Sequence, residues 1–150
     1  MNGWRIIMDE NTIQLLKECS SGCHMAMESV KKMREYAKDS ELNNLLEAYG
    51  EKHRTLEGKI SDQLKSCGKY ESFPSKMAEV MARTEMNVKM MMHPDDHQVA
   101  KIMMDGCNMG IQSVSEYVNK YPDASKESQD MAKQLIKIEE DFMKEMKGFV

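Results

Sequence analysis

Four side chains of types that bind metal ions are candidates for chemistry in this sequence: Cys23, His53, Cys107 and Glu139. Each lies near the middle of a long segment with helical periodicity, so four packed helices could bring them to a similar height. Two thiolates and an imidazole suit Zn²⁺ or Cu⁺, and a carboxylate adds an oxygen ligand. These four residues are therefore a candidate site for a zinc, copper or iron ion.

The same residues also have a purely structural interpretation. Cysteine is among the most commonly buried residue types and packs as a small hydrophobe, and the chain has no Cys-x-x-Cys spacing. A histidine on an apolar stripe is commonly a core residue hydrogen-bonded by a neighbour, here Glu139 or Tyr49. Cys19 and Cys23, four residues apart, are then core filler. In this interpretation the protein holds no cofactor.

The elements that position these residues are all predicted to be helices. Apolar or small residues recur at steps of three, four and seven, and the three prolines fall in the gaps between such segments. We expect four long helices and no strand, with a shorter helix in the connection between the second and the third. The long helices are expected at about 11–38, 40–68, 93–121 and 125–150, and the short one at 75–92. The expected N-caps of the first three are Asn11, Ser40 and His93.

Two of these helices are related in sequence. Residues 21–30 (SGCHMAMESV) and 105–114 (DGCNMGIQSV) are identical at five of ten positions. We interpret this as an internal repeat of a two-helix unit. Gly22 and Gly106 recur at matched positions inside helices, where glycine costs about 1 kcal/mol relative to alanine. Close approach of a neighbouring helix is expected at both glycines.

Two antiparallel helical hairpins, joined by a long crossover with its own short helix, resemble the ferritin and rubrerythrin superfamily from about residue 11 onward. The resemblance implies an all-α, ferritin-like four-helix bundle. It also implies a di-metal centre made by a Glu on each of two helices and a Glu-x-x-His on each of the others. Here Gly50 stands where the acid before His53 is expected, and Phe142 stands where the histidine after Glu139 is expected. We therefore expect a divergent member without an intact di-iron motif.

Composition limits the class of protein. A chain of 150 residues with 41% apolar and 31% charged side chains suits a single domain over 1–150, with 1–10 as a loose N-terminal extension. The net charge of −4 argues against nucleic acid as a partner. The longest uncharged stretch, 106–115, is half of the roughly 20 residues that a membrane-spanning helix needs. Four cysteines without a disulfide framework, and no signal peptide, predict a cytoplasmic location.

Methionine is the unusual feature of the composition, because its 17 residues outnumber leucine and valine combined. We expect a soft, adaptable core. Met90, Met91 and Met92 end the predicted crossover helix, and at least one must point outward, toward a second copy or a partner helix. We expect a non-catalytic binding or assembly protein, most simply a homodimer, and find no motif that implies a reaction. The alternative is a metal-binding or redox-responsive protein that uses the Cys/His/Glu set.

Overall fold

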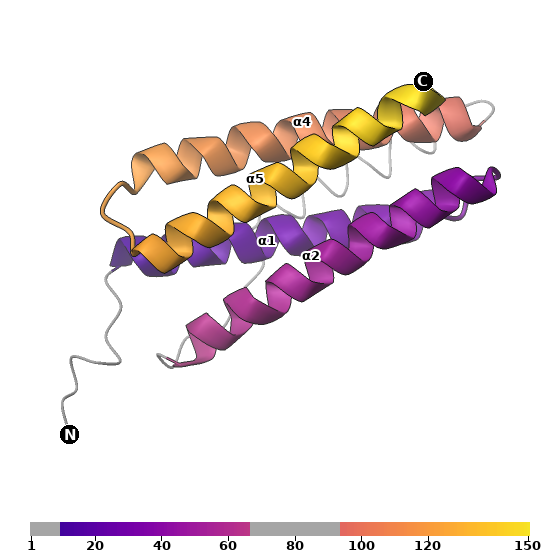
Figure 1. The fold of residues 1–150 in the computed structure, drawn as a ribbon. Coiled ribbons are helices and arrows are strands. Elements are labelled where there is room, and N and C mark those ends of the chain that lie inside the picture. The colour runs from indigo at the N-terminus through magenta and orange to yellow at the C-terminus, as the bar shows by residue number, and fades with distance from the viewer. Residues whose placement is uncertain (1–9, 67–93) are drawn as a thin grey trace.

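The computed structural model describes residues 10–66 and 94–150, which form four long α-helices and one short 3-10 helix (Figure 1). No strand occurs in these two ranges, so the all-α prediction is confirmed there. The predicted crossover helix at 75–92 lies outside the described residues. So does the predicted N-terminal extension, apart from Glu10, which begins the first helix. The elements are α1 (Glu10–Met33), α2 (Ser40–Ser66), α4 (Asp96–Lys120), α5 (Lys126–Met146) and η2 (Lys147–Phe149).

The helices form two antiparallel hairpins, α1 with α2 and α4 with α5, packed side by side into a bundle (Figure 1). Between the hairpins, α5 packs on both α1 and α2, and α4 packs on α1. Helices α2 and α4 run in the same direction, so α2 ends and α4 begins at opposite ends of the bundle. This topology confirms the predicted pair of hairpins with a long crossover. No helix in the described ranges is sufficiently long and apolar to cross a bilayer.

Carboxylates cap two of the helices, at positions that differ from the sequence prediction. The N-cap of α2 is Asp39, whose Oδ1 accepts the backbone N–H groups of Glu41 at 2.8 Å and Leu42 at 3.1 Å. Ser40 is already helical, so its prediction as the cap was wrong. The N-cap of α4 is Asp95, which accepts from the backbone of Gln98. Aspartate is a strong N-cap because its side chain reaches the free N–H groups of the first turn.

The starts of α1, α4 and α5 lie close to the predicted positions. The N-cap of helix α4 lies two residues after the predicted cap His93, because Asp95 supplies the capping oxygen. Helix α1 already includes Asn11, which was expected to be its cap. Helix α5 begins after Ser125, whose Oγ accepts the backbone N–H of Ser128, in agreement with the predicted start.

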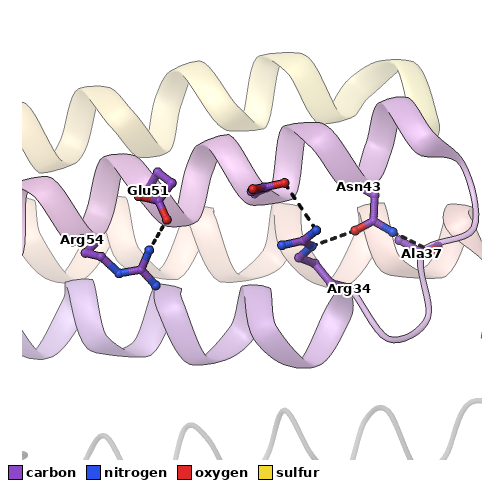
Figure 2. Close-up of polar contacts among 6 residues, drawn as sticks. Arg34, Ala37, Asn43, Glu51 and Arg54 are labelled. Atoms are coloured by element: carbon purple, nitrogen blue, oxygen red, sulfur yellow. Dashed lines mark hydrogen bonds and ion pairs between the residues drawn. The ribbon is translucent and has the colours of Figure 1, made fainter.

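The turn between α1 and α2 is held rigidly and is tied to the second hairpin. Asn43 donates to the carbonyl of Ala37 at 2.9 Å and accepts from Nε of Arg34 at 2.8 Å (Figure 2). The two carboxylate oxygens of Asp96, at the start of α4, accept the backbone N–H groups of Lys38 at 2.6 Å and Asp39 at 3.1 Å. These bonds fix the turn against the first residues of α4.

Figure 2 also shows an ion pair between Glu51 and Arg54 on the outer face of α2. Both side chains are largely exposed. An exposed pair of this kind contributes little to stability, because water and salt screen it.

Two apolar clusters fill the bundle, one at each end. Leucine rather than methionine dominates them, since every described leucine except Leu45 is buried. Among the described methionines only Met33, Met103 and Met146 are buried, and Met109 is 42% exposed. The expected methionine core is therefore present only in part.

Close helix approach occurs at different glycines from those predicted. A Cβ added to Gly106 would meet nothing within 4 Å, so that prediction was wrong, because Gly106 faces away from the bundle. At Gly22 the neighbour is Leu135 at an ordinary 3.5 Å. The tight positions are Gly50, whose Cβ would lie 3.3 Å from Val30, and Gly110, whose Cβ would lie 3.3 Å from a carboxylate oxygen of Glu139.

Candidate functional site

The buried polar residues at mid-bundle lie between the two apolar clusters. On α2, His53 separates Tyr49 of one cluster from Leu56 of the other. On α5, Glu139 lies between Leu135 and Phe142, which belong to different clusters. The side chain of His53 is fully buried and Glu139 is 4% exposed. Burying such groups is costly unless they are hydrogen-bonded, so their partners decide what the site can do.

Glu139 is hydrogen-bonded to two side chains of α2. The hydroxyl of Tyr49 lies 2.8 and 2.7 Å from the two carboxylate oxygens, and Nε2 of His53 lies 2.5 Å from Oε1. The other ring nitrogen of His53, Nδ1, is 2.8 Å from the backbone carbonyl oxygen of Tyr49. The predicted structural role of His53, a core histidine bonded by Glu139 or Tyr49, is confirmed with both residues as partners.

Neighbouring residues of α4 and α5 pack against this network. The ring of Phe142 stacks on that of Tyr49, with centroids 3.9 Å apart, and Gly110 leaves the space that the Glu139 carboxylate fills. In sequence, Gly50-x-x-His53 and Glu139-x-x-Phe142 each lack one half of a Glu-x-x-His motif. In the structure, His53 and Glu139, the residues that remain of the two motifs, are hydrogen-bonded to each other. The imidazole and the carboxylate are thus one connected pair.

Two cysteine thiols, Cys107 and Cys23, interact with the network of His53 and Glu139. Sγ of Cys107 lies 3.6 Å from the hydroxyl of Tyr49, so Cys107 reaches Glu139 through that hydroxyl. Burial raises the pKa of the Cys107 thiol well above its usual range, and the charge of Glu139 raises it further. Burial likewise raises the pKa of Cys23, with further contributions from Cys19, Glu57 and Glu139. The structure therefore brings Cys23 and Cys107 into the electrostatic field of Glu139.

Cys19 precedes Cys23 by four residues on α1, belongs to the same apolar cluster and is fully buried. Burial, followed by the charge of Glu18, raises the pKa of its thiol to about 12. Because only the thiolate is a good nucleophile and metal ligand, the raised pKa values disfavour reaction and metal binding at the three described thiols.

A second polar network lies between α1 and α2. Ser20 donates to Oε2 of Glu57 at 2.8 Å, and Nε2 of His24 lies 3.3 Å from Oε1 of the same carboxylate. Glu57 is 8% exposed. Sequence reasoning did not identify this network. The available signal was spacing: Ser20 and His24 are four residues apart on one helix, and Glu57 is four residues after His53 on another.

The donor set does not fit the di-metal centre that the family resemblance implied. Such a centre needs inward carboxylates on all four helices. Here α1 and α4 present Cys19, Cys23 and Cys107, and the only buried acids of the described residues are Glu57 and Glu139. Within ranges 10–66 and 94–150, no three His, Cys, Asp or Glu side chains are arranged to hold a metal ion.

Comparisons with known proteins identify the fold. No protein-family model and no curated protein matches the chain in sequence. Among solved structures, a DUF305 fragment from Deinococcus radiodurans is similar with a TM-score of 0.75 and 14% identity, over 94% of this chain and 95% of that one. Dps92 from Deinococcus radiodurans follows with a TM-score of 0.72 and 14% identity, over 93% and 86%.

A third similar structure is the bacterioferritin-related protein of Bacteroides fragilis, described as a dodecameric thioferritin. It has a TM-score of 0.70 and 14% identity, over 99% of this chain and 86% of that one. The architecture is therefore the ferritin-like four-helix bundle. At this level of identity the likeness concerns the fold, and the function must be argued from the residues of the site.

Proposed function

We propose that this ferritin-like bundle is a non-catalytic binding or assembly protein without a standard di-iron centre. The observation that supports the proposal is the bonding of Glu139. Its two oxygens are hydrogen-bonded to Tyr49 and His53, inside a site that packed side chains bury. A buried carboxyl group that is bonded in this way serves to hold α2 and α5 together rather than to bind an incoming ligand.

Assembly is the simplest use for such a bundle, and we propose a homodimer. The relative from Bacteroides fragilis is described as dodecameric, which supports self-association but not a particular number of subunits. The methionine-rich segment that ends at Met90, Met91 and Met92, proposed as a contact for a second copy or a partner helix, lies outside the described residues.

Light scattering and element analysis of protein purified without an affinity tag test this proposal together. We expect the mass of a dimer and less than stoichiometric zinc, copper or iron, with no change in thermal stability when a chelator is added. A monomer at all concentrations would exclude self-association. Stoichiometric metal that is lost in His53→Ala, but kept in the exposed control His97→Ala, would exclude the metal-free scaffold.

A second candidate function is metal binding or redox response through Cys23, His53, Cys107 and Glu139. The observation in its favour is that His53 is hydrogen-bonded to Glu139 and that the charge of Glu139 raises the pKa of both Cys23 and Cys107. Thiolates and imidazole would suit zinc or copper better than iron. Binding would require both thiols to lose their protons and the His53–Glu139 bond to open. The element analysis described above separates this candidate from the first.

A further inference from the structure

The bonding of the His53 ring fixes where its protons lie. Nδ1 is 2.8 Å from the backbone carbonyl oxygen of Tyr49. A carbonyl oxygen can only accept a hydrogen bond, so Nδ1 must carry a hydrogen and donate it. This assignment comes from the partner atom alone and does not depend on the charge of the ring.

The second ring nitrogen requires another proton. Nε2 of His53 lies 2.5 Å from Oε1 of Glu139. If neither atom carried a hydrogen, two lone pairs would face each other at that distance, which is repulsive. A proton therefore lies between them, either as an imidazolium beside a carboxylate or as a neutral imidazole beside a carboxylic acid. Both arrangements contain two protons and give the pair a net charge of zero.

The other hydrogen-bond donors around His53 and Glu139 are consistent with two protons on this pair. The single hydrogen of the Tyr49 hydroxyl points to the Glu139 carboxylate, and the thiol of Cys107 can then donate to the Tyr49 oxygen. Among the described residues, Cys19 and Cys23 of α1 and Glu57 of α2 are further titratable groups near this region. No lysine or arginine of the described residues is buried, so none neutralises a charge on Glu139. The proton shared with His53 therefore balances the negative charge of Glu139.

The separation of the two atoms is that of a hydrogen-bonded pair and is shorter than the separation of two ligands of one metal ion. Metal–nitrogen and metal–oxygen bonds of about 2.0–2.2 Å at a tetrahedral angle place two ligand atoms ~3.3 Å apart. The 2.5 Å between Nε2 and Oε1 is well below that separation. In this arrangement, a metal ion could bind both atoms only if the two side chains moved apart.

We propose that His53 and Glu139 share one buried proton, in the position between an imidazole and a carboxylate that a cation would otherwise take. This inference goes beyond the proposed function, because it concerns the occupant of the pair and not what the protein assembles with. A divalent ion can use these two ligands only by displacing that proton and moving the side chains apart.

Nuclear magnetic resonance of the full-length protein, with ¹⁵N-labelled histidine, tests the proposal. We expect the Nδ1 of His53 to be protonated, and a proton signal far downfield of the backbone amides to couple to its Nε2. That downfield signal should be lost in Glu139→Gln and kept in Glu57→Gln, the matched change at the other buried acid.

An unprotonated Nδ1 in the natively folded wild-type protein would overturn the proposal, as would absence of the downfield signal or its survival in Glu139→Gln. The wild-type spectrum decides the question even if Glu139→Gln does not fold. Since the readout is independent of mass and metal content, its failure can be told apart from failure of the proposed function.

Discussion

Replacing Tyr49 by Phe removes one hydroxyl from the centre of the bundle and leaves the ring in place. The ring is 4% exposed and stacks on Phe142, so the apolar packing is expected to persist. The loss is the hydrogen bond to Glu139, at 2.7 Å from the nearer oxygen. A hydrogen bond to a charged group contributes about 1.5–3 kcal/mol net. We therefore expect Tyr49→Phe to lower the free energy of unfolding by about 2 kcal/mol.

Urea unfolding followed by circular dichroism measures this change, and thermal unfolding provides a second reading. For a chain of this length, a loss of about 2 kcal/mol corresponds to a fall in Tm of roughly 4–8 °C. The matched control is Tyr36→Phe, since Tyr36 is half-buried against the same apolar cluster but takes no part in the Glu139 network. We expect that control to stay within about 0.5 kcal/mol of the wild type.

The reasoning would be refuted if Tyr49→Phe cost no more than Tyr36→Phe, because Glu139 would then not depend on the hydroxyl. A double-mutant cycle with Glu139→Gln adds a sharper criterion. Directly bonded partners should show a coupling energy of about 0.5–3 kcal/mol, whereas independent sites give additive losses.

Three further predictions concern the glycines, the α1–α2 turn and the thiols. Gly106→Ala should raise the free energy of unfolding by up to about 1 kcal/mol, whereas Gly110→Ala should lose that gain because its Cβ would press on Glu139; parallel melts that show equal gains would contradict this. Asp96→Asn should cost about 1 kcal/mol and speed amide exchange at Lys38, whose N–H it binds; unchanged exchange would count against the tie between hairpins. Stability should fall as pH rises above about 9, the ordinary thiol value, because the unfolded chain releases the Cys19 proton that the folded chain holds to about 12. The fall should be about 1 kcal/mol per pH unit for such a thiol, and a Cys19→Ala variant with an identical pH profile would disprove its contribution.

The helices and their topology could be predicted from the sequence, because the spacing of apolar residues determines which face of each helix is buried. The partner of His53 could be narrowed to Glu139 or Tyr49 for the same reason, since all three side chains lie on inward faces. The start of α5 at Ser125 follows from local chemistry that a single segment contains, because the Ser125 side chain caps the first turn of its own helix. Such features require no knowledge of the neighbouring helix.

Features that depend on two helices at once could not be predicted. Gly106 and Gly110 look alike in sequence, yet only Gly110 meets a side chain, because the contact is decided by where α5 crosses α4. The burial of Glu57 was missed for a similar reason: an acid is counted as a surface residue unless its donors, Ser20 and His24, are known. Asp39 displaced Ser40 as a cap because the turn presents its carboxylate to the first N–H groups of α2.

The two polar networks differ in the length of chain that each one closes. Ser20 and Glu57 are 37 residues apart and belong to one hairpin, so their bond can form as soon as α1 meets α2. His53 and Glu139 are 86 residues apart, and their bond needs both hairpins to be assembled and docked. We expect the first bond to form in an early step of folding and the second in a late one, because contacts between residues far apart in the sequence form later. Weakening the His53–Glu139 bond will therefore mainly speed unfolding and leave the folding rate nearly unchanged, so this buried pair governs how long the bundle, once formed, stays closed.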